Sequence, residues 1–168
     1  LARFAETFLY LIDEDESKAI KIIEKILNKY KNFFYTNWNI MMSKKMNLNL
    51  KQDNSQIIKE FLDLMHIYKL DYTNTFLNLE NNKLDKNIFG DWIEKYKKIN
   101  KKKYNNINPI IIPRNHIIEK IINNAYNENY DKMYEFEKIY TNPYSISNIE
   151  FMSPPSDNEK VYETFCGT

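Results

Sequence analysis

The chain has 168 residues, with 24 lysines and arginines against 23 aspartates and glutamates, so its formal net charge at pH 7 is +1. This length predicts a hydrophobic core that needs no metal or disulfide to hold it. Two glycines exclude a glycine-rich phosphate-binding loop, and one cysteine with two histidines excludes the usual tetrahedral zinc site and an internal disulfide.

No stretch of the sequence is long and apolar enough to predict a membrane span. The longest apolar run, Phe8 to Ile12, is far shorter than the ~20 residues that cross a bilayer, so we expect a soluble chain with no membrane partner. The first residue is Leu1 and no targeting signal is recognisable. We therefore expect the chain to be a piece of a longer protein.

The first two predicted helices cover residues 2–12 and 16–46. The second has the clearest helical period, because its apolar residues follow one another in steps of three and four. They are Ile20, Ile23, Leu27, Tyr30, Phe34, Trp38 and Met41. The acidic run from Asp13 to Glu16 favours the start of a helix, where the N-terminus is electropositive. Helices joined so closely are expected to pack antiparallel.

Three amphipathic helices are predicted in the middle of the chain. Asp53 or Ser55 caps the first, Asp71 the second and Asp85 the third. Their apolar residues again follow helical spacing and are expected to form the core. They are Ile57, Ile58, Phe61, Leu62, Met65, Tyr68, Phe76, Leu79, Ile88, Phe89, Trp92, Ile93, Tyr96 and Ile99.

Two more helices are predicted at residues 113–125 and about 130–140. Pro113 fits the first helical position, where its missing N–H costs nothing. Residues 141–168 have no apolar period and contain three prolines, which predicts an extended, docked tail. The predicted fold is all-α, with a helical region over residues 1–140 followed by that tail.

Two histidines and one acidic run are the first candidates for chemistry. We interpret His66 and His116 as structural or exposed residues, because the sequence places no nucleophile and base together. The run from Asp13 to Glu16 has the oxygen ligands that Mg²⁺ prefers, but we favour a solvated helix N-terminus for it. No catalytic, cofactor-binding or metal-binding residue is assigned here.

A lysine cluster from Lys95 to Lys103, with Tyr96 and Tyr104 interleaved, has the composition of a surface that binds a polyanion. The near-zero net charge and the presence of only two arginines favour a solvated helix face instead, so no nucleic-acid partner is predicted. Arg114 has a forked side chain that suits a carboxylate or several carbonyls, or that ties its helix to a neighbouring loop.

Cys166, near the C-terminus, is the one residue with redox potential. A free thiol reacts according to its access and its thiolate fraction. The sequence leaves two interpretations open for Cys166, a reactive site and an inert tail cysteine.

Read in order, several short segments resemble the C-terminal portion of the selenoprotein O family, which are protein adenylyltransferases with a pseudokinase fold. The resemblance runs nearly from end to end. It is carried by Ala2-Arg3-Phe4-Ala5-Glu6, Asp71-Tyr72-Thr73-Asn74-Thr75-Phe76, Phe89-Gly90-Asp91-Trp92, Asn108-Pro109, Pro113-Arg114-Asn115-His116, Asn142-Pro143-Tyr144, Pro154-Pro155 and Phe165-Cys166-Gly167-Thr168.

The resemblance implies that the parent protein transfers AMP from ATP to Ser, Thr or Tyr hydroxyls of other proteins, with Mg²⁺ or Mn²⁺. In that family the catalytic, ATP and metal residues lie upstream, so this fragment is expected to bind no cofactor and to be inactive alone. Its implied partners are the upstream kinase-like lobe and the protein substrates. Cys166 matches the family's C-terminal cysteine or selenocysteine, which implies a redox-regulatory role.

The implied location is mitochondrial in a eukaryote and cytoplasmic otherwise. The alternative interpretation is a helical protein-interaction module without catalysis.

The chain departs from the family pattern at two places. Lys45, Met46 and Asn47 stand where the family often has Lys-Leu-Gly, and asparagine also tolerates the left-handed conformation that ends a helix. Leu77 stands where an arginine is common after Phe76. If that arginine forms a salt bridge in relatives, this chain lacks it.

Overall fold

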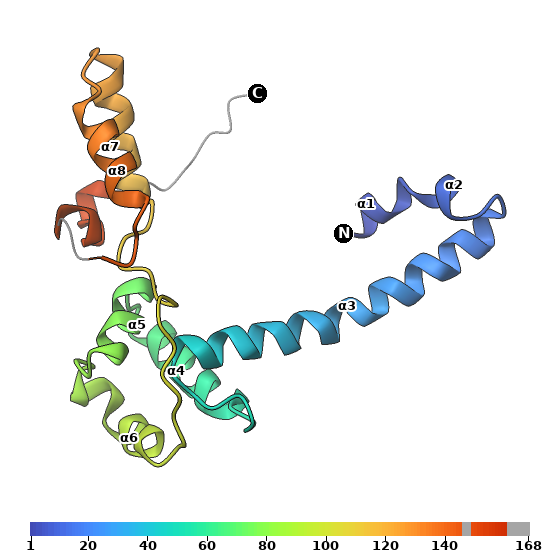
Figure 1. Ribbon diagram of the computed structural model, residues 1–168, viewed down its shortest axis with the longest axis horizontal. Coiled ribbons are helices and arrows are strands. Elements are labelled where there is room, and N and C mark those ends of the chain that lie inside the picture. Colours follow the sequence, from blue (N-terminus) through green and yellow to red (C-terminus); the bar gives the residue numbers. More distant parts are fainter. Residues whose placement is uncertain (146–148, 161–168) are drawn as a thin grey trace. The chain divides into compact units, whose positions relative to one another are not determined.

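The computed structural model describes residues 1–145 and 149–160, and within them the regular structure is helical (Figure 1). Their β-type pairing is limited to one isolated bridge between Leu48 and Lys101. The all-α prediction is therefore confirmed. The chain divides into two compact units, Leu1–Ser43 and Lys44–Thr168. The predicted boundary between residues 140 and 141 stays a prediction, and Cys166 lies outside the described residues.

The first unit contains α1 (Ala2–Glu6), α2 (Leu9–Ile12) and most of α3 (Glu16–Lys45). The single helix predicted over residues 2–12 is wrong, because it breaks at Thr7. The Thr7 hydroxyl donates to the Phe4 carbonyl at 2.7 Å, and the backbone N–H groups of Thr7 and Phe8 bond three residues back. This tightened turn interrupts the α-helical ladder.

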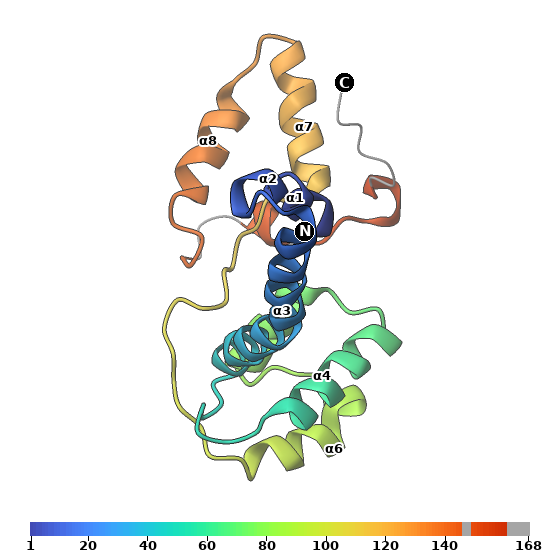
Figure 2. The same ribbon diagram turned by 90° about the vertical axis from the view of Figure 1, so that its right-hand side faces the viewer.

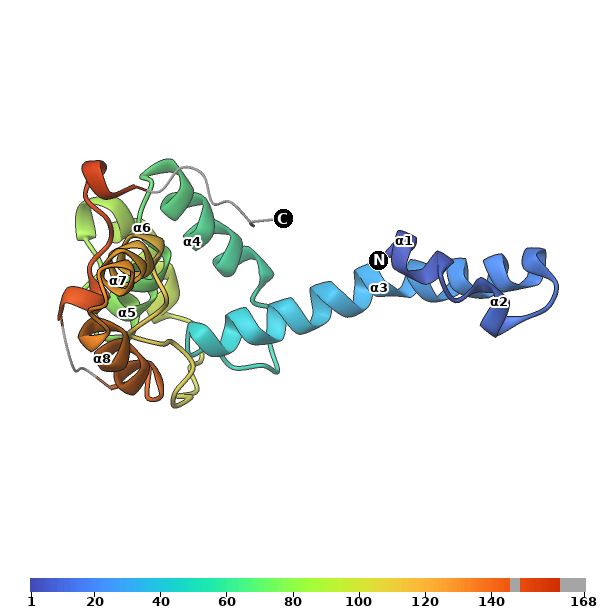
Figure 3. The same cartoon turned by 90° about the horizontal axis from the view of Figure 1, so that it is seen from above.

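The apolar stripe of α3 is only partly buried. Figure 3 shows α1 and α2 folded back along the first turns of α3, where Ala19 and Ile23 are buried. Farther along the helix, Tyr30, Phe34 and Met41 of the predicted stripe are exposed. The helix was predicted correctly, and its spacing identifies an apolar face without identifying what covers it.

The second unit contains α4 (Ser55–Ile67), α5 (Tyr72–Glu80) and α6 (Lys86–Lys97). α4 and α6 lie side by side (Figure 2). Phe61 of α4 lies in the middle of an aromatic core, with ring centroids 5.3 Å from Phe76, 5.3 Å from Phe89 and 4.8 Å from Trp92. These four predicted core residues are all buried, whereas the prediction for Tyr68 is wrong, since it is 51% exposed at the end of α4.

The ends of these helices follow the predicted side-chain signals closely. The Asp71 carboxylate accepts a bond from Asn74 N at 2.8 Å, and Asp85 accepts one from Asn87 N at 2.8 Å. Asp53 likewise accepts a bond from Ser55 N, although the N-cap position itself is Asn54. The capping predictions for α5 and α6 are therefore confirmed.

Asn47 follows α3 with a φ of 53°, in the left-handed region. Its carbonyl accepts a bond from Lys102 N at 3.0 Å, and its side-chain oxygen accepts one from Tyr104 N at 2.9 Å. The predicted left-handed role of Asn47 is confirmed. The side chain adds a long-range bond that glycine cannot make.

The C-terminal elements are α7 (Asn115–Tyr126) and α8 (Asp131–Tyr140), with short 3₁₀ turns η1 (Ile149–Met152) and η2 (Asp157–Glu159). α7 and α8 lie side by side (Figures 1 and 2). The buried cluster here consists of Ile111, Ile117, Ile121 and Phe151.

Pro113 is not the first residue of α7, contrary to the prediction. The helix begins two residues later, because Arg114 takes the extended backbone of an N-cap, with φ −80° and ψ 133°. Its carbonyl accepts bonds from Ile117 N and Ile118 N, both at 3.0 Å.

Candidate functional site

Two of the segments that carry the family resemblance meet at the N-terminus of α5. Arg114, which is only 7% exposed, donates from Nη1 to Asp71 Oδ2 at 2.8 Å and from Nη2 to Asp71 Oδ1 at 2.9 Å. Asp71 is the N-cap of α5 and Arg114 is the N-cap of α7. One carboxylate therefore joins the starts of two helices that are 43 residues apart in the sequence.

The charge state of Asp71 is set by this environment. Burial on its own raises the pKa of the carboxyl, but the hydrogen bonds from Arg114 and Asn74 and the guanidinium charge outweigh it. The pKa of Asp71 is consequently below its ordinary value. A carboxylate was one of the partners predicted for Arg114, and the fold identifies it as Asp71.

The other end of α5 is held by another of the segments that carry the resemblance, Asn108-Pro109. Asn108 is buried and its Nδ2 donates to the Lys45 carbonyl at 2.9 Å and to Glu80 Oε2 at 3.2 Å. Glu80 is the last residue of α5. α5 is therefore anchored at both ends by polar side chains from the segment that precedes α7.

Lys45 lies between these two anchors. Its Nζ lies 4.7 Å from the centre of the Phe76 ring and 5.4 Å from that of Tyr72, within the range of cation–π attraction. Burial lowers the pKa of Lys45, and the nearby Glu80 carboxylate opposes that shift.

The Phe89-Gly90-Asp91-Trp92 segment contributes to the core. Phe89 and Trp92 are buried, and Trp92 Nε1 donates to the Ile57 carbonyl at 2.9 Å. Gly90 has open space where a Cβ would lie, so its missing side chain is not required by packing within the described chain.

The two histidines occupy different environments. His66 is exposed on α4, whereas His116 is buried at the start of α7. Burial lowers the pKa of His116, with an opposing effect from Glu159 and lesser lowering effects from Lys120 and Arg114. The described structure thus places His116 among charged side chains rather than beside a nucleophile.

The residues after α8 dock on α7 through one buried ring and one surface ion pair. Phe151 is buried against Ile117 and Ile121, and Lys120 forms an ion pair with Glu159. The hydrogen bond from Lys120, followed by those from Ser156, lowers the pKa of Glu159 to about 2.

One of the two aromatic rings in the lysine cluster is buried and the other is partly exposed. Tyr96 is buried, and its hydroxyl donates to the Met46 carbonyl at 2.6 Å, while burial raises its pKa to about 12. Lys101 lies 4.1 Å from the Tyr96 ring centre, and Lys95 pairs with Glu60 at 2.9 Å. Part of the cluster is therefore used within the fold.

The acidic run acts as a helix start. Asp13 accepts a bond from Asp15 N at 2.9 Å, and Asp15 accepts one from Ser17 N at 2.9 Å. Among residues 1–145 and 149–160, no group of three or more His, Cys, Asp or Glu side chains is placed to hold a metal ion.

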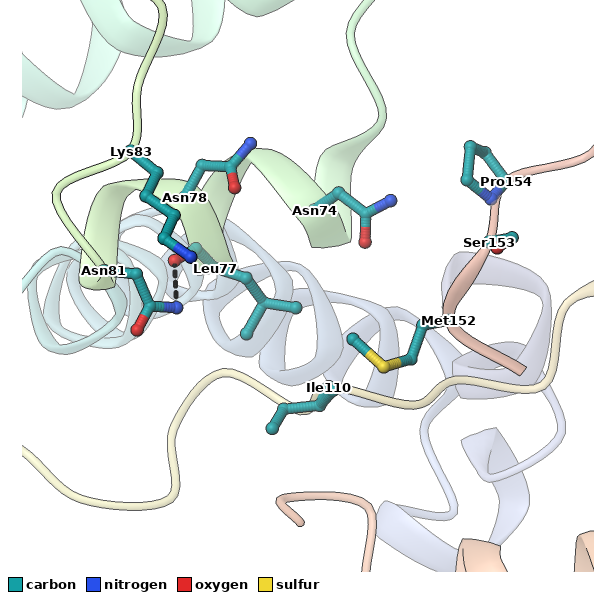
Figure 4. A pocket seen from close by; sticks show the side chains of 9 residues that line it. All are labelled: Asn74, Leu77, Asn78, Asn81, Lys83, Ile110, Met152, Ser153 and Pro154. Carbon is teal, nitrogen blue, oxygen red and sulfur yellow. Dashed lines mark hydrogen bonds between the residues drawn. The ribbon is translucent and has the colours of Figure 1, made fainter. Parts of the chain in front are cut away.

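A surface pocket of about 410 Å³ lies against α5 (Figure 4). Leu77, the departure from the family pattern, forms part of one wall, and Met152, the last residue of η1, faces it. The remaining lining residues are Asn74, Asn78, Asn81, Lys83, Ile110, Ser153 and Pro154. The polar side-chain groups among these described lining residues are one ammonium group, three amides and the hydroxyl of Ser153.

This donor set does not fit ATP with a divalent cation. Nucleotide-transferring sites hold their phosphates with several cationic or backbone N–H donors and their metal with carboxylates. The described residues that line this pocket include no carboxylate. The pocket suits an uncharged or weakly anionic polar group better than a nucleotide.

Comparison with known proteins identifies relatives along the entire chain. Proteins named protein nucleotidyltransferase YdiU are 35% identical over 188 aligned positions in Bacillus cereus, 36% over 189 in Bacillus thuringiensis and 30% over 188 in Brevibacillus brevis. The chain is homologous to one part of these nucleotidyltransferases. This similarity confirms the resemblance carried by the short segments. No protein-family model matches the chain.

The match covers 100% of this chain but only 38% of the length of each of these YdiU relatives. The chain therefore corresponds to a minor part of the relatives. Across the described residues, every helix is too short or too polar to cross a bilayer.

Proposed function

We propose that this chain is the C-terminal helical part of a protein adenylyltransferase with a kinase-like fold. The parent would transfer AMP from ATP to Ser, Thr or Tyr hydroxyls of other proteins. The role of the chain in that enzyme is structural or regulatory. The alignment with the nucleotidyltransferase relatives covers this chain from its first to its last residue, and it supports this assignment.

One structural observation carries the structural part of the proposal. Residues of the segments that resemble the family are those that fix the second unit internally, through the Arg114–Asp71 pair, the Asn108 bonds and the buried Trp92. Side chains engaged in buried hydrogen bonds and ring contacts are committed to holding the fold. This pattern is typical of a supporting region.

The cofactors of the proposed reaction are ATP and Mg²⁺ or Mn²⁺, held by the rest of the parent protein. Such transfer depends on metal ions that neutralise the phosphates and on cationic groups that position them. The pocket of Figure 4 lacks that donor set among its described residues, so we assign no part of the nucleotide site to it.

A redox role for Cys166 remains part of the proposal. The position matches the C-terminal cysteine or selenocysteine of the resembling family, and it lies outside the described residues. Oxidation of the parent is expected to change AMP transfer, whereas Cys166→Ser is expected to abolish that response and leave the fold intact. If AMP transfer is equal in the oxidised parent, the reduced parent and the Cys166→Ser variant, Cys166 is an inert cysteine.

The location of the protein follows from the same proposal. The relatives named above are bacterial, for which we propose the cytoplasm. A eukaryotic source would instead favour the mitochondrion.

The proposal is tested by comparing the parent protein with this chain alone. Each is incubated with labelled ATP, Mg²⁺ or Mn²⁺ and a cell lysate, and label attached to protein is measured. We expect transfer by the parent and none by the chain. Transfer by the isolated chain would show that the catalytic residues have been placed in the wrong part of the protein.

A helical interaction module without catalysis is the second candidate, favoured by the exposed apolar side chains of the first unit. It predicts that the parent labels no protein under any of these conditions, while the chain still binds a partner protein. Labelling by the parent separates the two candidates.

A further inference from the structure

The middle of α3 presents an apolar face that the first unit leaves open. At 3.6 residues per turn, five large side chains fall on one side of the helix. They are Tyr30, Phe33, Phe34, Ile40 and Met41, here called the α3 patch, and all five are exposed, with Phe33 exposed by 69%.

The same face is covered at the beginning of the helix. Ile23 and Leu27 line an apolar hollow of about 210 Å³ together with Phe4, Phe8 and Ile12 of the α1–α2 segment. α1 and α2 thus shield only the first turns, and the α3 patch continues the same apolar face beyond them (Figure 3).

The opposite side of the helix is polar, which shows that the patch is a true face. Positions Asn28, Asn32, Thr36 and Asn39 lie on that side by helical spacing. Covering a large apolar side chain is worth roughly 1.5–3 kcal/mol, so five such side chains on one face provide a substantial driving force for association. Exposed apolar side chains gathered on one face mark an interaction site, and the one polar residue among them, Asn37, donates its Nδ2 to the Phe33 carbonyl.

We propose that the α3 patch is the surface on which the rest of the parent protein docks. This inference rests on the proposed function for the identity of the occupant. The chain aligns along its whole length with relatives of which it spans 38%, so the greater part of a parent of that size lies outside this sequence. An internal segment of the same protein is present at high effective concentration, which favours it over a second copy.

The charges beside the patch specify the occupant further. From Lys25 to Lys45 the sequence contains lysines but neither aspartate nor glutamate. Lys29 and Lys31 fall at the two borders of the patch by helical spacing. The docking segment is therefore an apolar surface, bordered by acidic side chains that complement these two lysines.

Hydrogen exchange of the parent and of the isolated chain tests this docking directly. We expect the amides of residues 28–41 to exchange about ten- to a hundredfold more slowly in the parent, the ratio that corresponds to burying one such ring. Equal exchange in both proteins would overturn the proposal. This readout does not depend on AMP transfer, so an inactive parent with a protected α3 would reject the proposed function alone.

Paired variants of the parent make the test independent of whether the isolated chain folds. Phe33→Asp is expected to abolish the protection and lower the melting temperature by several degrees. Tyr35→Asp is the matched control, because Tyr35 is a similarly exposed ring (56%) on the polar side of the same helix, and it is expected to change neither.

Three results would contradict the proposal. Equal effects of Phe33→Asp and Tyr35→Asp would show that docking does not depend on the α3 patch. Protection that depends on protein concentration and disappears on dilution would assign the patch to a second copy of the chain. Protection that appears only with anionic lipid vesicles would assign it to a membrane surface.

Discussion

The two compact units differ in how their apolar side chains are used. In the second unit, Phe61, Phe76, Phe89 and Trp92 enclose one another and are buried. In the first unit, rings such as Phe33 and Tyr10 are exposed, and more than half of the exposed large apolar side chains of the described residues lie in residues 1–43. Comparable aromatic content therefore gives a core in one unit and an open surface in the other.

This difference shows what helical periodicity does and does not determine. A stripe of apolar residues in steps of three and four defines a face, and burial of that face requires an opposing surface. α4, α5 and α6 supply such surfaces to one another, whereas α1 and α2 are too short to cover α3. Substitutions in each unit test whether its side chains contribute to stability in the way that this difference implies.

The largest expected effect is the loss of the ring at the middle of the core. Phe61→Ala should lower the free energy of unfolding by about 3–5 kcal/mol, because it removes a fully buried ring and leaves a cavity. Phe33→Ala in the isolated chain is the matched control in the first unit. Because Phe33 is exposed, this substitution should change the free energy of unfolding by less than about 0.5 kcal/mol. Denaturant unfolding followed by tryptophan fluorescence measures both. Equal losses would contradict the contrast between the units.

Removing the guanidinium that joins α5 to α7 should have the next largest effect. Arg114→Ala leaves the half-buried Asp71 carboxylate without its partner and should cost about 2–4 kcal/mol in unfolding free energy. Arg3→Ala is the control, since the Arg3–Glu6 pair is exposed, and no change is expected. An unaffected Arg114→Ala protein would show that the pair does not anchor α5.

The left-handed residue after α3 should respond to the type of substitution. Asn47→Ala should cost about 1–2 kcal/mol, because alanine lacks the short polar side chain with which asparagine tolerates a φ of 53°, and because the bond to Tyr104 N is lost. Asn47→Gly keeps the backbone conformation and should cost only about 0.5–1.5 kcal/mol for that bond. Thermal unfolding compares the stabilities of the two variants. An Asn47→Ala variant that is more stable than Asn47→Gly would contradict the left-handed role of Asn47.

The buried His116 should make stability depend on pH. Its pKa is lowered in the fold from the ordinary 6.5, so the folded state binds a proton less readily than the unfolded state. Its contribution is present above about pH 6.5 and is lost as the pH falls through the folded-state value. His116→Asn should flatten the stability profile between about pH 7 and 5. Identical profiles for the His116→Asn variant and the unaltered chain would contradict the burial argument.

The smallest expected effect is a gain. Gly90 lies inside α6 with open space at its Cβ position, so Gly90→Ala should raise the free energy of unfolding by about 0.5–1 kcal/mol through reduced backbone entropy of the unfolded chain. A loss of stability would mean that the helix surface at this position is more crowded than the described chain shows.

Local signals in the sequence predicted much of the second unit. Asp71 and Asp85 cap their helices as predicted, and Asn47 takes the left-handed conformation in place of glycine. These features depend on a few neighbouring residues, which a sequence displays directly. The break at Thr7 and the extended Arg114 after Pro113 were missed, because each is decided by a competing hydrogen bond or backbone preference at the boundary.

Long-range features could not be predicted in the same way. The fork of Arg114 indicated a carboxylate partner, but Asp71 is 43 residues away and no local pattern selects it. Tyr96 was placed within a lysine surface, although its ring is buried and its hydroxyl bonds Met46. Charge and period describe a residue's neighbours along the chain, whereas these contacts depend on how separate helices pack.

The central claim is that this chain supports a nucleotidyltransferase whose reactive residues lie elsewhere in the same protein. The most direct measurement is AMP transfer by the parent from which residues 1–168 have been deleted, with and without the chain added back as a separate polypeptide. We expect deletion to abolish AMP transfer, and we expect addition of the chain to restore a measurable part of it. Full transfer by the deleted protein, with the chain absent, would contradict the central claim.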